Sequence, residues 1–136
     1  MKEIMNKKFL IIAGIFGALG VILGAFGAHS LKSVLSEYQL SIFKTGIQYH
    51  FYHTFALLGL ALFGKFSEYK YLKTAAWLFV IGILFFSGSL YLLACREVLN
   101  LNSLTPILGP ITPIGGMLFL FGWCCIIWTG IRMKNS

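Results

Sequence analysis

The chain has 136 residues, of which 58% are hydrophobic and 11% are charged, and its mean hydropathy is +0.84. Soluble domains are typically about 45–50% apolar and about 25% charged, so this composition excludes an ordinary soluble domain and indicates a single membrane domain over residues 1–136. The net charge of +7 would suit a nucleic-acid-binding protein, but no basic stripe is interleaved with stacking aromatic residues, and we expect no nucleic acid among the partners.

Residues 9–28 form the first apolar run, which contains no charged residue. A hydrocarbon core of about 30 Å is crossed by about 20 helical residues, so this run predicts a membrane-spanning helix. The run exceeds the apolar core of about 7–15 residues in a signal peptide, and we interpret it as a retained helix. Gly17, Gly20, Gly24 and Gly27 share one face, which predicts close packing against another helix, within the bundle or between protomers.

The segment 30–45 follows the first run and is more polar. Its apolar side chains recur at helical spacing, while serine, lysine and glutamate side chains fall largely on the other side. This pattern predicts an amphipathic helix in the membrane interface between the first and second spans. A lid that closes over a cavity is the alternative role for this segment.

Residues 47–64 predict the second span and contain His50 and His53, which lie one helical turn apart and share a face. His29 lies at the end of the first span, so the three imidazoles could lie at a similar depth, as in a zinc or copper site. No carboxylate or thiolate clearly joins them. We therefore expect structural hydrogen bonds, with ligand or proton handling as the alternative, and we predict no metal ion and no cofactor.

Residues 74–95 predict the third span, and Ser87 and Ser89 flank a glycine near its middle. Small residues with hydroxyl groups bond across helices or back to their own carbonyl groups inside membranes, so helix packing is the first interpretation and a polar cavity wall the second. The three cysteines of the chain form no C-x-x-C pair and are interpreted as ordinary buried thiols.

Residues 107–131 predict the fourth span, whose start is interrupted by Pro106, Pro110 and Pro113. Proline removes a hydrogen bond inside a helix and clashes with the preceding turn, whereas it is favoured in the first turn. We therefore expect the regular helix to begin near Pro113, with residues 105–112 forming a bent approach that could help to wall a site.

The basic residues indicate the orientation of these spans. Eight of the eleven Lys and Arg residues lie in the N-terminus, the connection between the second and third spans, and the C-terminus. The positive-inside rule then predicts a multi-pass protein of the plasma (inner) membrane with both termini in the cytoplasm, and anionic headgroups among its membrane lipid partners. The expected fold is an all-α bundle of four transmembrane helices with the amphipathic helix between the first two.

Catalytic motifs are absent from the sequence. It contains no H-E-x-x-H motif, nucleophile elbow, phosphate loop or pair of carboxylates. We therefore predict no catalytic residue, and an enzyme is the least favoured class of function.

Four blocks of the sequence resemble a known family. GAFGAH, FKTGIQYHFYHTFALL, LFFSGSLYLLA and TPIGGMLFLFGW are similar, in collinear order over nearly the whole chain, to the YgdD/YwdK-like small membrane proteins. This family is catalogued as domain of unknown function 423, and transmembrane protein 256 of animals is similar to it. The resemblance implies four spans and no established activity. His50 departs from the family pattern, in which glutamine is usual at this position, and the resemblance leaves His29 and His53 as the family-type pair.

The resemblance also implies which positions belong to the family motifs. These are His29, Phe43, Thr45, Gly46, Tyr49, His53, Ser87, Gly88, Ser89, Tyr91, Thr112, Pro113, Gly115, Gly116, Gly122 and Trp123.

Two functional hypotheses remain. The first is the binding or transport of a small solute, a lipid or a quinone-like molecule in a polar pocket between helices, formed by His29, Thr45, Tyr49, His53, Ser87, Ser89, Tyr91 and Thr112. The second is a structural or assembly role, in which the protein packs against partner helices or forms a homo-oligomer. The residues expected to pack helices are Gly17, Gly20, Gly24, Gly27, Gly115 and Gly116.

Overall fold

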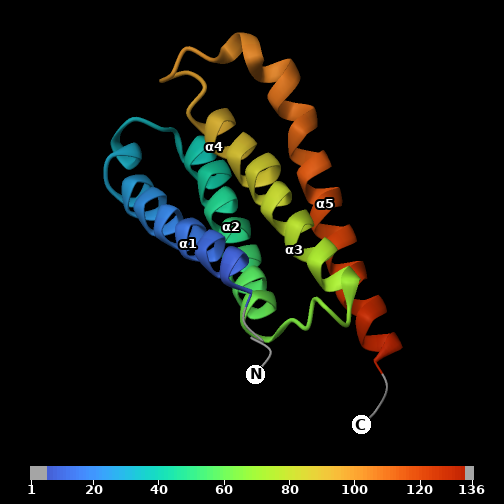
Figure 1. Ribbon diagram of the computed structural model, residues 1–136. Coiled ribbons are helices and arrows are strands. Elements are labelled where there is room, and N and C mark those ends of the chain that lie inside the picture. The colour runs from blue at the N-terminus through green and yellow to red at the C-terminus, as the bar shows by residue number, and fades with distance from the viewer. Residues whose placement is uncertain (1–5, 134–136) are drawn as a thin grey trace.

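The computed structural model describes residues 6–133, which fold into four long helical segments and contain no strand (Figure 1). The segments are α1 (Lys7–Ala28), α2 (Glu37–Phe63), the continuous helix α3–η2–α4 (Lys70–Gly82, Ile83–Ser87, Gly88–Ala94) and α5 (Thr105–Arg132). Two short 3₁₀ turns, η1 (Leu31–Ser33) and η3 (Asn102–Leu104), lie in the connections. The predicted all-α class is therefore confirmed.

Successive helices run in opposite directions, so α1 begins and α5 ends at the same end of the bundle, which we call the terminal end (Figure 1). The start of α1 is tied there to the end of α2. The backbone N–H of Asn6 donates to the carbonyl of Ala61 at 2.8 Å, and the Asn6 side chain donates to the carbonyl of Gly64 at 3.0 Å.

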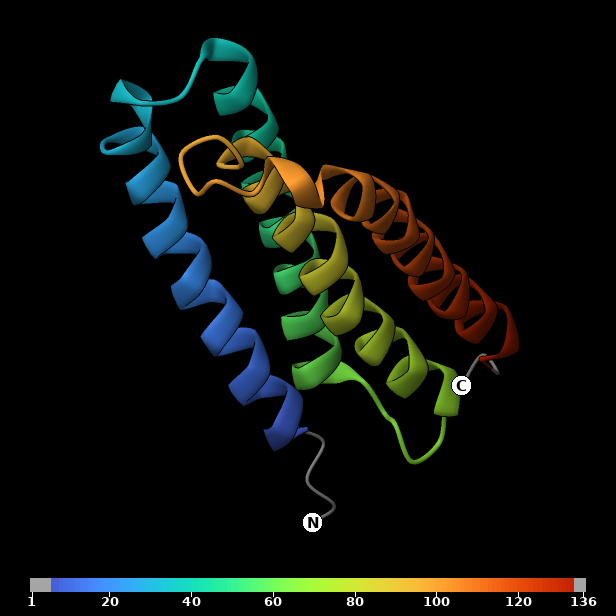
Figure 2. The ribbon, with the colours of Figure 1, turned by 90° about the horizontal axis from the view of Figure 1, so that it is seen from above.

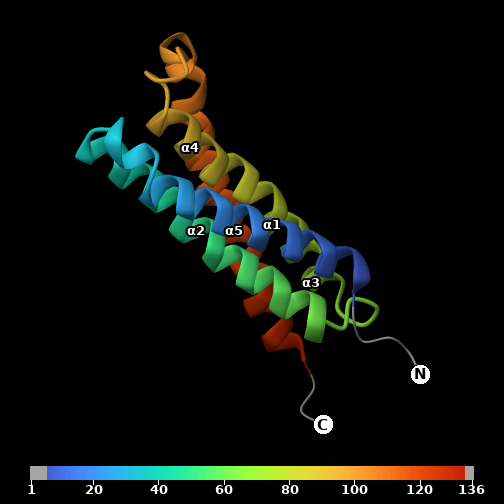
Figure 3. The ribbon, with the colours of Figure 1, turned by 90° about the vertical axis from the view of Figure 1, so that its left-hand side faces the viewer.

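The helices do not form a closed ring. α2 and α3–η2–α4 form a central pair, α1 packs on α2, and α5 packs on α3 and η2 (Figure 2). Figure 3 shows α1 and α5 on opposite sides of this pair. Each outer helix therefore buries one face and leaves a broad apolar face outside, as expected where lipid is the solvent.

The predicted separate amphipathic helix over 30–45 is wrong. Its first residues form the turn η1, and the rest belong to α2. The reason is a capping box: the Gln39 N–H donates to the Ser36 hydroxyl at 3.2 Å, and the Ser36 N–H donates to the Gln39 side-chain oxygen at 2.9 Å. The apolar stripe is real, but Leu31, Leu35 and Phe43 use it to pack in a cluster with Ala94 of α4.

Three of the long helices have the length and hydropathy of membrane spans, and α2 does not reach that hydropathy. α2 has 27 residues and is about 40 Å long at about 1.5 Å per residue, so it is long enough to cross a bilayer. Its lower hydropathy comes from glutamine, histidine, threonine and tyrosine side chains.

The predicted start of the fourth helix at Pro113 is also wrong. α5 begins at Thr105, with Pro106 in its first turn and with Pro110 and Pro113 inside it. These prolines are spaced by four and three residues, so they lie on one face, and that face is exposed. Proline has no backbone N–H, so the backbone hydrogen bonds missing from α5 all lie on this exposed side of the helix.

Aromatic rings resting on glycines hold the helices together. Five glycines each lie against an aromatic ring of a neighbouring helix, and a Cβ atom on the glycine would lie only 2.5–2.8 Å from that ring. The pairs are Gly20 with Phe51, Gly27 with Phe43, Gly46 with Tyr91, Gly82 with Phe119, and Gly122 with Phe79. Gly115 approaches the backbone of Phe86 inside the π-helical segment η2 even more closely. Each glycine gives a neighbouring ring or backbone the room that a side chain would occupy.

Candidate functional site

His50 closes the junction between α1, α2 and α4. Its Nε2 lies 2.7 Å from the carbonyl oxygen of Phe16, and its Nδ1 lies 2.9 Å from the hydroxyl of Tyr91. A carbonyl only accepts, so Nε2 carries the proton and Nδ1 accepts from Tyr91. The imidazole is neutral, 3% exposed, and fully used by these two bonds. This arrangement leaves no lone pair for a metal ion.

His53 lies one turn further along α2 and faces α5. Its Nδ1 donates to the carbonyl of Tyr49 at 2.8 Å, and its Nε2 accepts from the indole N–H of Trp123 at 3.1 Å. Its ring stacks on Phe119 with a centroid distance of 3.5 Å and an interplanar angle of 4°. The second histidine is therefore also a neutral side chain whose orientation is fixed.

The hydroxyl groups near the middle of the bundle form bonds across helices. Ser87 donates to the carbonyl of Gly46 on α2 at 2.7 Å, and the Ser89 and Thr112 hydroxyls lie 2.6 Å apart between α4 and α5. Within residues 6–133, no buried side-chain nitrogen or oxygen lacks a hydrogen-bond partner. The polar groups thus stabilise the contacts between helices.

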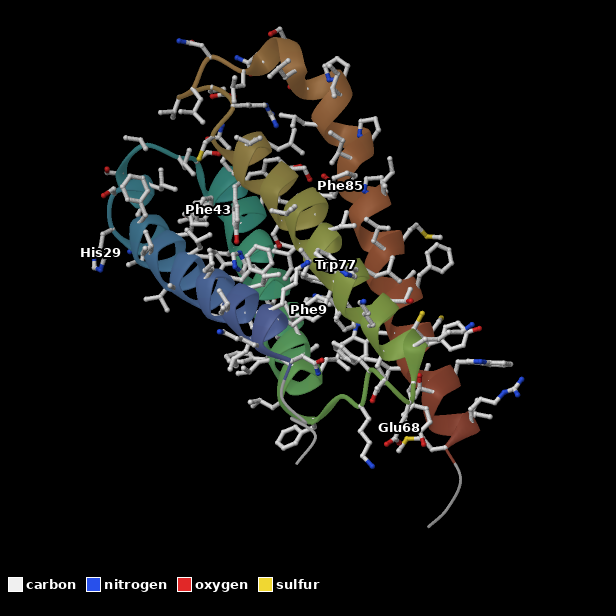
Figure 4. All side chains as sticks on the ribbon, viewed as in Figure 1. Phe9, His29, Phe43, Glu68, Trp77 and Phe85 are labelled. Atoms are coloured by element: carbon white, nitrogen blue, oxygen red, sulfur yellow. The ribbon has the colours of Figure 1, made fainter. Side chains whose placement is uncertain are left out.

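The structure does not gather the expected polar-pocket residues into one hollow. His29 is exposed at the end of α1 (Figure 4), and Thr45 is exposed and donates to the carbonyl of Ser41 at 3.0 Å. Tyr49 and His53 face α5, whereas Tyr91 belongs to the junction with α1. The Ser87 hydroxyl bonds to α2, and the Ser89 and Thr112 hydroxyls bond to each other between α4 and α5.

The three histidines were expected to lie at a similar depth in the membrane, and the structure shows that they do not. The chain reverses near residues 34–36 and not near 46, so α2 begins about ten residues earlier than the second predicted span. His50 consequently lies beside Phe16, which is about 20 Å along α1 from His29. Within residues 6–133, no three His, Cys, Asp or Glu side chains are grouped closely enough to hold a metal ion.

A groove lies between α2 and α5, beside His53. It has a volume of about 640 Å³ and opens on the side of the bundle, between an edge of α2 and the middle turns of α5. Its lining consists of Tyr49, Tyr52, His53, Phe86, Pro113, Gly116, Met117, Phe119, Leu120 and Trp123.

The floor and the walls of this groove differ in character. His53 and Phe119 are buried and form a stacked pair at the floor, and the Phe86 and Tyr49 rings lie 4.7 Å apart at one side. On α5, Gly116 presents no side chain, and the Trp123 ring closes the far end. The groove is therefore aromatic on most sides and open to the surroundings of the helix pair.

Sequence analysis missed part of this groove. Of the lining residues, Tyr49, His53 and Gly116 are sequence-predicted site or packing residues, and Pro113 and Trp123 are positions of the family motifs, whereas Phe86, Met117, Phe119 and Leu120 have no predicted role. The available signal was the spacing of Gly116, Phe119, Leu120 and Trp123, which recur at helical intervals and share one face.

Comparison with known proteins places this architecture in a family. The family model described as "Protein of unknown function (DUF423)" matches residues 23–116. The chain is 40% identical over 127 residues to the UPF0382 membrane protein YwdK of Bacillus subtilis, an alignment that covers 93% of this chain and 98% of the relative.

Relatives in other bacteria are similar over comparable lengths. A UPF0382 membrane protein of Haemophilus influenzae is 40% identical over 132 residues, covering 96% of this chain and 99% of the relative. The UPF0382 inner membrane protein YgdD of Escherichia coli is 34% identical over 133 residues, covering 97% and 96%. No solved structure matches the chain. These similarities confirm the resemblance seen in the sequence motifs, and the chain belongs to the DUF423 (UPF0382) family of integral, multi-pass membrane proteins of unknown function.

Proposed function

We propose that this protein binds a lipid-soluble molecule with a flat ring, of the quinone class, in the groove between α2 and α5. We further infer that α2 crosses the bilayer as the other three long helices do, because it lies antiparallel between α1 and the α3–η2–α4 helix. With four crossings, the terminal end carries both chain ends. The excess of basic residues at that end supports a cytoplasmic location.

The stacked pair of His53 and Phe119 is the observation that carries the binding proposal. Bonds to Tyr49 and Trp123 and the stack on Phe119 fix the imidazole, so the floor of the groove is rigid before a ligand arrives. A ring that enters the groove meets the edges of this pair and the neighbouring rings of Tyr49 and Phe86. A preorganised surface binds more tightly because no side chain has to be ordered on binding. Aromatic pairs contribute roughly 0.5–1.5 kcal/mol beyond the burial of area, which favours a ring over a flexible acyl chain.

The mouth of the groove supports an amphiphilic ligand. Tyr49 and Tyr52 lie on α2 nearer to its start than His53 does, and the Gln48 side chain lies 2.6 Å from the Tyr52 hydroxyl. In the four-crossing arrangement these groups lie about midway along α2 and so near the middle of the membrane, where lipid offers a polar ligand group no hydrogen bond. Their hydroxyls are suitable donors to the oxygen atoms of a quinone ring, whose apolar tail would extend into the lipid.

Two observations favour this function over the other hypotheses. A water-soluble solute would need unpartnered polar groups, and the buried polar atoms of residues 6–133 are already partnered. An assembly role through the glycine face of α1 is less favoured, because Gly20 and Gly27 are already in close contact with Phe51 and Phe43 of the same chain and, of the four glycines on that face, Gly24 alone meets nothing within 4 Å.

Quenching of Trp123 fluorescence tests the proposal. A short-chain naphthoquinone is titrated into the full chain in nanodiscs, with Trp77 and Trp128 replaced by phenylalanine so that Trp123 alone reports. We expect saturable quenching. Gly116→Leu fills the groove and should raise the Kd about tenfold, because the loss of a ring contact of about 1.4 kcal/mol corresponds to that factor.

Gly130→Leu is the matched control, because a side chain at Gly130 enters open space away from the groove. It should leave the Kd unchanged. Quenching that does not saturate, or that is the same in Gly116→Leu and Gly130→Leu, would mean that the groove holds ordinary acyl chains, and the proposal would be wrong.

A further inference from the structure

A second cavity lies at the terminal end, between the start of α3 and the last turn of α5. Its volume is about 490 Å³. The residues that line it are Ser67, Glu68, Tyr69, Lys70, Tyr71, Trp128, Thr129 and Arg132. We call it the basic cleft. It shares no residue with the groove between α2 and α5, and it does not depend on the function proposed for that groove.

Both cations of the basic cleft lie on aromatic rings. The guanidinium carbon of Arg132 lies 4.7 Å from the centroid of Trp128, and the ammonium nitrogen of Lys70 lies 5.3 Å from the centroid of Tyr71. A ring face attracts a cation without neutralising its charge. The rings therefore hold two full positive charges at the wall of the cleft.

Neither cation has an acidic partner within residues 6–133. The one acid that lines the basic cleft is Glu68, and it pairs with Lys65 at 3.9 Å (Figure 4 labels Glu68 at this end). Both side chains of that pair are more than half exposed, so the pair is weak, but it draws the carboxylate toward Lys65. Lys70 and Arg132 thus remain available to an external anion.

The surroundings of the basic cleft match the headgroup region of a membrane. Among residues 6–133, the terminal end carries six basic residues and one acid, whereas the opposite end carries three basic residues and two acids. A third cation–ring pair, Lys8 on Trp77 at 4.5 Å, lies at the same end. Tryptophan, tyrosine and lysine at the ends of apolar helices are characteristic of the membrane–water interface.

Exposed apolar side chains next to the basic cleft distinguish a lipid from a free anion. Tyr71, Trp128 and Ile131 are 42%, 43% and 70% exposed, and they continue from the cleft onto the apolar sides of α3 and α5. A phospholipid can place its phosphate between the cations and its glycerol and first methylene groups along these side chains. Inorganic phosphate gains nothing from them.

We propose that the basic cleft binds the headgroup phosphate of an anionic phospholipid, with Lys70 and Arg132 as its cationic contacts. The aromatic rings of Tyr71 and Trp128 position these cations and line the path of the lipid. The protein would then carry a bound anionic lipid between the ends of α3 and α5.

Native mass spectrometry of the detergent-solubilised full chain tests this site. Phosphatidylglycerol and phosphatidylcholine are titrated separately, and we expect preferential binding of phosphatidylglycerol. Lys70→Gln and Arg132→Gln should each weaken that binding about fivefold, the factor for one basic residue near an anionic surface. Arg132→Lys keeps the charge and loses the planar stacking group, so its effect should be smaller.

Lys32→Gln and Lys44→Gln, at the opposite end, are the matched controls and should change the binding less than twofold. Both sets of side chains are exposed, so all four variants should fold, as thermal unfolding will verify. Three results would each overturn the proposal: equal binding of phosphatidylcholine, equal losses in the control variants, or displacement of the lipid by an equal concentration of inorganic phosphate.

Discussion

The two histidines of α2 make the same kind of bonds in different surroundings. At each imidazole, one nitrogen donates to a backbone carbonyl and the other accepts from an aromatic side chain. The His50 junction joins three helices and is enclosed by them. The His53 junction joins α2, α3 and α5, since the Phe79 ring lies 5.3 Å from His53 and 5.1 Å from Trp123, but it borders an open groove.

Backbone spacing explains this difference. At His50, Gly46 lets the Tyr91 ring lie against α2, and Gly20 lets Phe51 lie against α1, so the three helices approach closely. α2 and α5 are separated by the α3–η2–α4 helix, and only long side chains such as His53 and Trp123 bridge them. The same hydrogen-bonding pattern therefore stabilises packing in one place and leaves a cavity in the other.

Replacement of His50 should have the largest effect on stability. His50→Leu removes both bonds and leaves the Tyr91 hydroxyl without its acceptor. We expect a loss of about 2–3 kcal/mol in the free energy of unfolding, from a buried group left unpaired and a bond lost within the membrane. Reversible unfolding of the detergent-solubilised protein in sodium dodecyl sulfate measures it.

His50→Gln is the informative control for this effect. A glutamine amide can donate to the Phe16 carbonyl through its N–H and accept from Tyr91 through its oxygen, so the loss should stay below about 1 kcal/mol. If glutamine destabilised the protein as much as leucine, the two hydrogen bonds would not be what holds the junction.

A methyl group at Gly46 should loosen the enclosed junction more mildly. The added Cβ atom of Gly46→Ala would lie 2.8 Å from the Tyr91 ring, so the ring must shift and weaken its bond to His50. Overpacking of this kind costs roughly 1–3 kcal/mol, partly offset by the better helix propensity of alanine. Gly88→Ala, where the methyl group meets nothing within 4 Å, should be neutral or stabilising in the same unfolding assay.

Much of this fold was predictable from the sequence because the membrane imposes it. The apolar runs locate α1 and the α3–η2–α4 helix within a few residues, since each such helix must cross a core of fixed thickness. The boundaries of α2 and α5 were not predicted. The capping box at Ser36 was overlooked, and the three prolines of α5 were treated as breaks although their spacing places them on one exposed face.

The candidate site was less predictable than the fold. His53 and Tyr49 were named from their type and spacing, but which helices would share a junction depends on the register between α1 and α2. That register follows from where the chain reverses, and a shift of about ten residues separates His29 from His50 by about 20 Å. The groove depends on α2 and α5 not being adjacent, a tertiary property that no local pattern reveals.

Removal of the indole donor at the open junction should have the smallest effect on stability. Trp123→Phe deletes the bond to His53 Nε2 but keeps a ring beside Phe79, whose centroid is 5.1 Å from that of Trp123. Hydrogen bonds between membrane helices contribute about 0.6 kcal/mol on average, and Trp123 is 42% exposed, so we expect a loss of about that size. A double-mutant cycle with His53→Leu in the same unfolding assay isolates the bond. A coupling as large as the loss in His50→Leu would mean that the open junction is as rigidly stabilised as the enclosed one, and that helix spacing does not explain their difference.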